Sequence, residues 1–141
     1  MGLLGDTDVA EIRERLAGMA NPVKLVHFTQ ELNLDYGREA QQLLAELTQI
    51  SDKLSLETYN FLVDKERVAE YAVDKVPATV IRNGRDYGIR FYGLPAGYEF
   101  AALLDGILAV SSGDSGLKPE SREKLAKLTQ PLHLQVFTTP T

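Results

Sequence analysis

The first half of the chain alternates between helix-like and strand-like spacing of its apolar residues. Apolar side chains recur at helical intervals over residues 9–19 and again over residues 40–50. Between these segments, residues 23–28 are nearly all apolar with little alternation, which is typical of an inner strand covered on both faces. Residues 54–63 mix β-branched and aromatic residues with polar ones and favour a more exposed strand. The pattern therefore predicts helix, strand, helix and strand in turn.

Polar residues indicate where the first two helices begin and end. Asp8 followed by Glu11 resembles a capping box at the first helix. Asn21-Pro22 ends that helix, because the residue before a proline is pushed out of the helical region. Asn33 and Asp35 are both favoured at the N-cap position, so either could open the second helix.

The second half predicts a short helix, a hairpin and a long helix. Asp64 caps a short helix that runs through Tyr71. Residues 78–81 and 88–92 flank Asn83-Gly84, a hairpin signal because both turn residues tolerate positive φ. Apolar residues between 100 and 108 then repeat at helical spacing, which predicts a strongly apolar helix.

The opening strand pattern occurs a second time near residue 130. Asn21 to Gln30 and Gln130 to Thr139 share proline, leucine, phenylalanine and threonine in register, roughly 100 residues apart, which is the size of one small domain. A Ser/Gly-rich linker and a helix from Pro119 to Leu128 precede the second copy. We therefore expect one folding unit, a connection, and the first strand of an incomplete second unit, with bounds 1–112, 113–129 and 130–141.

From residue 23 onward, the predicted order is βαβ followed by ββα. A parallel strand pair joined by a right-handed crossover, with an antiparallel hairpin added, is the pattern of the thioredoxin fold. The sequence thus predicts an α/β fold with a mixed four-stranded sheet flanked by helices and an additional N-terminal helix.

Charge and composition narrow the function classes. The net charge of −5 and the pI near 5.0 argue against nucleic acid as a partner, because phosphate binding needs a basic patch. No apolar run is long enough to cross a membrane, and the start lacks the basic region of a signal peptide, so we expect a cytoplasmic location.

The chain has no cysteine, which excludes a disulfide, a thiolate metal site and thiol chemistry within it. Glu31 and Asp35 have no histidine or cysteine at ligand spacing, so we expect solvated turn residues and no metal site. We expect no cofactor.

Four short motifs are distinctive: Val76-Pro77-Ala78-Thr79, the Asn83-Gly84 hairpin, the run from Gly93 to Phe100, and the closing run from Val136 to Thr141. Together they resemble the protein disulfide oxidoreductases, glutaredoxin-like proteins of thermophiles built from two tandem thioredoxin folds. In that family the closing Phe-Thr-Thr-Pro-Thr is followed at once by Cys-Pro-Tyr-Cys, and the chain printed here stops just before that site.

The resemblance implies a redox site that has lost its sulfur. Superposing the first unit on the second places Asn33-Leu34-Asp35-Tyr36 where the family has its first Cys-x-x-Cys. A cysteine at a helix N-terminus is a stabilised thiolate, whereas Asn33 keeps the capping ability without the nucleophile. No catalytic residue is therefore expected.

The resemblance also makes Pro77 a cis proline facing the redox site. The backbone of Val76 would then offer strand-like hydrogen bonds to a bound peptide; the alternative is a cis proline that serves only the turn. His27 lies where thioredoxins often bury an acid, although a satisfied core histidine is the simpler interpretation. For Tyr92, Tyr98 and Phe100 we expect packing rather than a stacking surface, since no basic stripe accompanies them.

Three functions fit these features. The first is the redox-inactive N-terminal unit of a protein disulfide oxidoreductase, acting as scaffold and as half of the substrate surface, with the missing C-terminal unit as its partner. The second is the corresponding part of an alkyl hydroperoxide reductase flavoprotein, which also doubles a thioredoxin fold and empties the first site. The third is a stand-alone module that binds extended peptides. A weak homodimer through the apolar tail is a further expectation.

Overall fold

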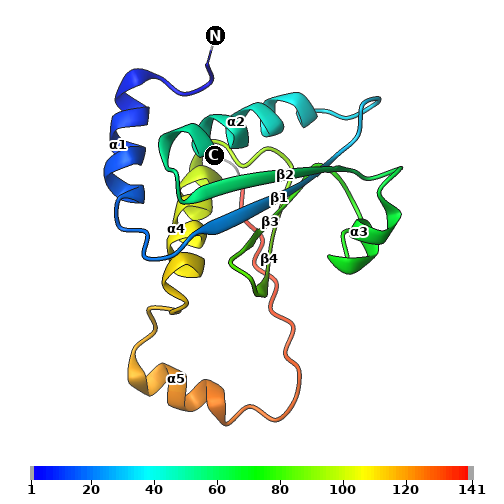
Figure 1. The fold of residues 1–141 in the computed structure, drawn as a ribbon. Coiled ribbons are helices and arrows are strands. Elements are labelled where there is room, and N and C mark those ends of the chain that lie inside the picture. The colour runs from blue at the N-terminus through cyan, green and yellow to red at the C-terminus, as the bar shows by residue number, and fades with distance from the viewer. Residues whose placement is uncertain (1, 140–141) are drawn as a thin grey trace.

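The computed structural model describes residues 2–139 of the 141-residue chain. Helices and strands alternate much as the sequence predicts (Figure 1). In chain order they are α1 (Asp6–Leu16), β1 (Val23–Thr29), α2 (Gly37–Ile50), β2 (Leu54–Asn60), α3 (Lys65–Glu70), β3 (Ala78–Arg82), β4 (Asp86–Tyr92), α4 (Tyr98–Ser112) and α5 (Pro119–Ala126). Within residues 2–139, no helix is both long and apolar enough to cross a membrane.

The strands form one mixed sheet in the order β2-β1-β3-β4. β1 pairs with β2 in parallel and with β3 antiparallel, and β3 and β4 form the antiparallel hairpin. The predicted α/β class, with a mixed four-stranded sheet flanked by helices and an additional N-terminal helix, is confirmed.

Both faces of the inner strand β1 are buried, which explains its nearly continuous apolar sequence. Val23 and Leu25 point into the core shared with α1, α2 and α4. Val26 and Phe28 point to the opposite face, where they pack with Tyr71 and other residues at and after α3. Because side chains alternate along a strand, a strand covered on both sides has no polar face to present.

The helix starts differ from the predicted ones. α1 begins at Asp6, where the carboxylate of Asp8 accepts a hydrogen bond from the N–H of Gly5 at 3.1 Å, so the expected pairing of Asp8 with Glu11 was wrong. α2 begins at Gly37, after both Asn33 and Asp35, and neither residue caps it. The chain needs the residues before Gly37 to turn from the strand direction to the helix direction.

The second strand ends earlier than predicted because two side chains capture the backbone after it. The side-chain oxygen of Asn60 accepts hydrogen bonds from the N–H groups of Leu62 and Val63, at 2.9 and 3.2 Å. The carboxylate of Asp64 accepts one from the N–H of Asn60 at 2.6 Å. These bonds form a turn over residues 61–63, where the pattern had predicted strand.

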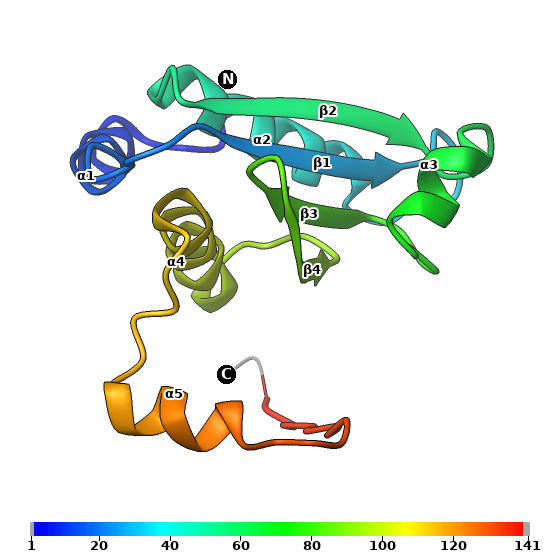
Figure 2. The same cartoon turned by 60° about the horizontal axis from the view of Figure 1, so that its bottom comes forward.

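The segment after α5 does not form the strand expected over residues 132–138. Up to residue 139 it has no regular secondary structure, and Leu134, Val136 and Phe137 are each more than 85% exposed. The segment overlaps the hairpin in Figure 1, but Figure 2 shows that it and α5 lie apart from the sheet. A strand requires a neighbour to take up its backbone hydrogen bonds, and the segment is not next to one.

Candidate functional site

The predicted degenerate site forms the loop between β1 and α2. Its residues line an open, mostly polar hollow together with the first residues of α2. Asn33 and Tyr36 have positive φ angles of 54° and 60°, which are uncommon for residues with a side chain. The side-chain amide of Gln30 donates to the carbonyl oxygen of Leu32 at 3.0 Å and to that of Asn33 at 3.5 Å, and so supports the turn.

Asn33 lies outside the helix that would activate a sulfur atom. α2 begins at Gly37, and the first bond of its ladder runs from the N–H of Ala40 to the carbonyl oxygen of Tyr36 at 2.9 Å. No side-chain cap is present on this helix, so the expectation that Asn33 retains a capping role was wrong. Position 33 therefore lacks the helix-terminus placement of a reactive thiolate as well as the thiol itself.

Close packing beneath the loop explains the glycine that opens α2. A Cβ atom on Gly37 would lie 2.5 Å from Cδ2 of Leu34 and 3.2 Å from Oγ1 of Thr29. Gly37 is buried, whereas Leu34 is only half-buried. Leu34 thus packs against Gly37 at the end of β1, and a larger residue at position 37 would require the Leu34 side chain to move.

The second predicted site element, Val76–Pro77, lies at the same end of the sheet. The peptide bond between these residues is cis, and the carbonyl oxygen of Pro77 accepts a hydrogen bond from the N–H of Gly93 at 2.8 Å. Phe28 is the register partner of Ala78 in the antiparallel β1–β3 pair. The residues after Phe28 and those before Ala78 therefore lie next to each other at one end of the sheet, as the thioredoxin pattern requires.

The backbone of Val76 is unpaired at this end of the sheet. Its N–H and C=O make no backbone hydrogen bond within residues 2–139. Its half-buried side chain packs against the core cluster that contains Phe28 and Tyr71. Pro77 itself is buried. The backbone of Val76, in the bend just before β3, is thus unpaired and could pair with a peptide.

His27 is fully buried on β1, on the face toward α2 and α4. Its Nδ1 lies 3.2 Å from Oγ1 of Thr79, whereas its Nε2 has no hydrogen-bond partner within residues 2–139. Burial lowers the pKa of His27 to about 4, against a smaller opposite effect of a backbone hydrogen bond with Ala78. The imidazole is therefore neutral at pH 7, and the expectation of a fully satisfied core histidine holds for only one of its nitrogens.

The remaining candidates are mostly structural. Tyr92 and Phe100 are half-buried and pack against the two cores, as expected. Tyr98, the first residue of α4, is 87% exposed, so packing was the wrong expectation for it. Glu31 and Asp35 are exposed, and within residues 2–139 no group of acidic or histidine residues could hold a metal ion.

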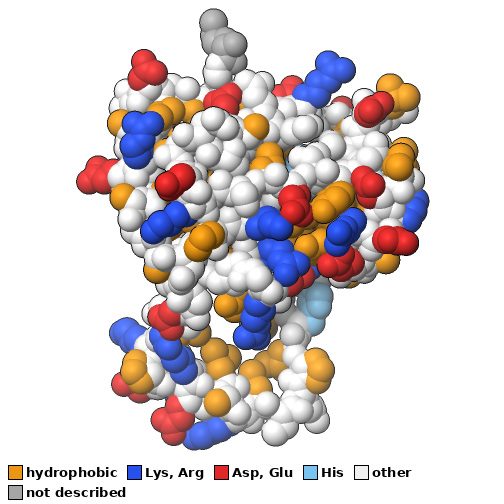
Figure 3. Space-filling view, viewed as in Figure 1, with side chains coloured by type: hydrophobic (Ala, Val, Ile, Leu, Met, Phe, Trp, Pro, Cys, Tyr) orange, Lys and Arg blue, Asp and Glu red, His pale blue; other side chains and the backbone are white. Residues whose placement is uncertain are grey.

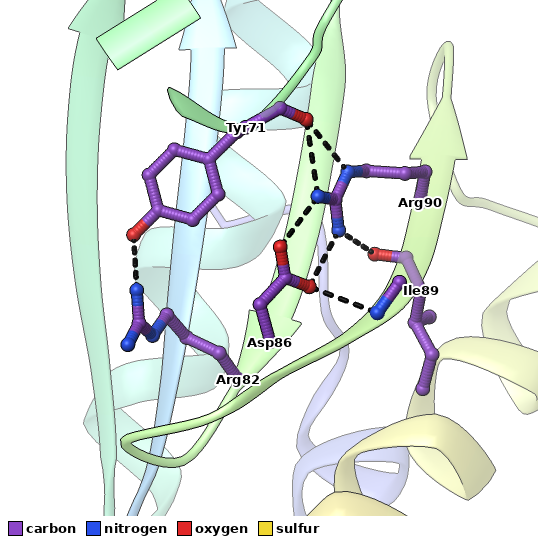
Figure 4. Close-up of polar contacts among 6 residues, drawn as sticks. Tyr71, Arg82, Asp86, Ile89 and Arg90 are labelled. Atoms are coloured by element: carbon purple, nitrogen blue, oxygen red, sulfur yellow. Dashed lines mark hydrogen bonds and ion pairs between the residues drawn. The ribbon is translucent and has the colours of Figure 1, made fainter. Parts of the chain in front are cut away.

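Sequence reasoning missed a polar cluster on the opposite face of the sheet (Figure 4). The guanidinium of Arg90 donates to both carboxylate oxygens of Asp86, at 2.9 and 2.6 Å, and to the carbonyl oxygen of Tyr71 at 3.0 Å. Arg82 donates to the hydroxyl of Tyr71 at 2.7 Å. The bond to Arg90 lowers the pKa of Asp86 to about 2. Asp86 and Arg90 carry opposite charges four residues apart on one strand, and so on the same face, which was the available signal. The cluster ties the hairpin to the end of α3.

The fold defines a thioredoxin-fold unit, and the loop between its β1 and α2 contains no cysteine. No family model matches the chain. Among solved structures, a protein disulfide oxidoreductase from Aeropyrum pernix shares 28% identity with a TM-score of 0.78, covering 88% of this chain and 55% of that one. An alkyl hydroperoxide reductase component of Enterococcus faecalis has a TM-score of 0.79 at 23% identity, over 89% of this chain and 61% of that one.

Curated proteins give a second line of similarity. An alkyl hydroperoxide reductase component of Staphylococcus aureus (strain NCTC 8325 / PS 47) is 31% identical over 108 residues, which is 76% of this chain. The corresponding protein of Xanthomonas campestris pv. phaseoli is 34% identical over 91 residues. The chain spans only 19% and 16% of the lengths of these two relatives. The resemblance to a thioredoxin-fold unit of a disulfide oxidoreductase, predicted from the sequence, is thus confirmed.

Proposed function

We propose that this chain is the redox-inactive N-terminal unit of a larger tandem thioredoxin-fold protein that exchanges disulfides. The observation that carries the proposal is the cysteine-free loop Asn33–Tyr36, in a chain similar over 88% of its length to a protein disulfide oxidoreductase. Exchange requires a thiolate that attacks a disulfide sulfur, and this unit has none to offer. Its role is that of scaffold and half of the substrate surface.

The substrate-binding part of this role is assigned to Val76. An extended peptide that pairs with its free N–H and C=O would be held at the end of the sheet where β1 stops and β3 begins. Such backbone pairing is independent of sequence, which suits a protein that handles many different disulfide substrates. A peptide or unfolded protein is accordingly the proposed partner class.

We further propose that residues 1–112 form this unit and that residues 130–141 begin the second unit. Residues 113–129, a linker and a helix, would connect the two. The repeated Pro, Leu, Phe and Thr positions support this division. So does the order of elements, since α1 precedes β1 as α5 precedes the tail. The apolar side chains of the tail are exposed and are those that a second core would bury. Figure 3 shows hydrophobic side chains at the surface in its lower part, where α5 and the start of the tail lie. The cytoplasmic location stays a prediction.

A second candidate is favoured by the curated relatives. Those described above are components of alkyl hydroperoxide reductases, at 31% and 34% identity. In that case the chain would be the first thioredoxin fold of a flavoprotein, and its role as a cysteine-free scaffold would be unchanged. The gene sequence on the C-terminal side of residue 141 separates the two, because a flavoprotein continues into an FAD-binding Gly-x-Gly-x-x-Gly segment.

An insulin reduction assay with dithiothreitol tests the inactivity of the unit itself. We expect the rate with the chain to equal the rate of the blank. Turnover well above the blank would overturn the proposal. A titration with an extended, disulfide-free peptide tests the surface role: binding should be lost when Val76 is replaced by proline, which removes the N–H, and retained in Val76→Ile.

A further inference from the structure

The structure contains an apolar hollow that the proposed function does not use. It has a volume of about 630 Å³ and lies between α1, the first turns of α2 and α4, and the loop before α4. The buried side chains of Ile12, Leu43 and Leu104 form its floor, and Leu94 and Phe100 line its wall. Pockets for small molecules range over about 300–1,000 Å³ with mainly apolar linings. The hollow is therefore the size of a small organic ligand.

The N-terminal side of the hollow is fixed by an ionised side chain. Leu3 and Leu4 line the hollow, and their N–H groups donate to the carboxylate of Glu46 on α2, at 2.8 and 3.0 Å. These hydrogen bonds lower the pKa of Glu46 below its ordinary value. The wall formed by Leu3 and Leu4 is thus fastened to α2.

Negatively charged side chains outnumber positively charged ones at the rim of the hollow. Asp8 and Glu11 on α1 and Glu39 on α2 line the hollow, and all three are exposed. Arg15 supplies the positive charge among the described lining residues, and it is already paired with Asp105 on α4. The mouth of an apolar cavity is therefore surrounded by carboxylates, which raises the local concentration of cations.

We propose that this hollow binds a small amphipathic organic cation, with its apolar body on the floor and its amine at the carboxylate rim. The chemistry follows from the two parts of the site. The floor removes apolar ligand surface from water, and the rim discriminates by charge. Neither the Asn33–Tyr36 loop nor Val76 lines this site, although Glu39 lines both this hollow and that of the loop. The proposal therefore stands whether or not the unit belongs to a disulfide-exchange protein.

The test compares ligands that differ only in the sign of their head group. Octylamine and octanoate are titrated into the full chain while backbone amide resonances are followed by NMR. We expect octylamine to bind saturably, with shifts centred on Ile12, Phe100 and Ala101, and octanoate to bind about fivefold to tenfold more weakly, as three exposed charge interactions allow. The preference should shrink at high salt and in the variant Glu11→Gln with Glu39→Gln.

A matched pair of variants on α4 places the ligand. Ala101 lines the hollow, whereas its exposed neighbour Ala102 does not, so Ala101→Phe should abolish octylamine binding and Ala102→Phe should preserve it. Both changes cost the helix the same propensity. Equal affinity for the two ligands, unsaturable shifts, or binding that survives Ala101→Phe would each overturn the proposal.

Discussion

The ring of His27 lies 3.2 Å from the hydroxyl of Thr79, across the β1–β3 pair at the centre of the sheet. Both side chains are fully buried, and Nε2 of His27 has no partner within residues 2–139. A proton added to this ring would have to be held without water or a counter-charge. The pair is therefore the most pH-sensitive element of the core.

We expect acid to destabilise the domain through His27. Its pKa falls from 6.5 to about 4 on burial, so the unfolded chain binds more protons and stability rises with pH between these values. The contribution is fully present above about pH 6.5 and is lost as the pH falls through about 4, up to about 3 kcal/mol in total. Urea unfolding at several pH values should show this slope in the native chain and not in His27→Gln. Equal slopes in both chains would contradict it.

A cysteine placed at position 33 should not become a reactive thiolate. In the variant Asn33→Cys, the sulfur precedes α2 by several residues, because the helix begins at Gly37. The helix N-terminus would then do little for the charged form, and the thiol should keep a pKa near its ordinary value of about 8.5. Thiolate absorbance against pH measures this directly. A pKa lowered by more than about one unit would show that the loop rearranges to meet the helix.

Gly37→Ala should destabilise the domain through overpacking against Leu34. The new methyl group would lie 2.5 Å from Cδ2 of Leu34, so the loop must shift, at a cost of about 1–2 kcal/mol. Adding Leu34→Ala should recover most of the loss. Gly18→Ala is the matched control, since its added Cβ atom would meet Arg15 at an ordinary 3.5 Å. Thermal melts of the native chain, Gly37→Ala, Gly37→Ala with Leu34→Ala, and Gly18→Ala test this. A melting temperature of Gly37→Ala equal to that of the native chain would refute the packing explanation.

Arg90→Lys should weaken the hairpin, although it keeps the charge. Lysine cannot bond both oxygens of Asp86 and the carbonyl oxygen of Tyr71 together, so we expect a loss of about 1–2 kcal/mol. Arg67→Lys is the control, because its pair with Glu70 lies in solvent and should leave the free energy of unfolding nearly unchanged. Chemical unfolding of both variants tests the difference, and equal losses would show that charge alone matters at position 90.

Deleting residues 130–141 should leave the first unit folded. The described residues of this tail are exposed and contribute nothing to either core. We expect an unchanged melting temperature and, in sedimentation, the loss of the weak homodimer expected from the apolar tail. Collapse of the domain on deletion would assign the tail to the first unit and overturn the two-unit proposal.

The helices and strands that form the core could be predicted from the sequence more fully than the loops and element ends that form the site. Apolar spacing identified the long helices and the first two strands, because a strand buried on both faces and a one-sided helix leave different periods in the sequence. Cap and turn residues identified α3 and the hairpin. Both signals failed at the ends of elements, where single side chains such as Asn60 and Asp64 capture the backbone. In the tail, a strand-like pattern forms no strand up to residue 139, since no strand lies beside it.

The sequence by itself determined that the chain carries no thiol chemistry, since no fold can supply a sulfur atom that the composition lacks. It also determined the order of elements and, through their resemblance, the place of the degenerate loop. Only the tertiary structure decided that Asn33 lies outside α2, that His27 meets Thr79, and that α1 encloses a hollow with a carboxylate rim. These features join residues that are distant in sequence, and such contacts depend on how the chain packs rather than on any local pattern.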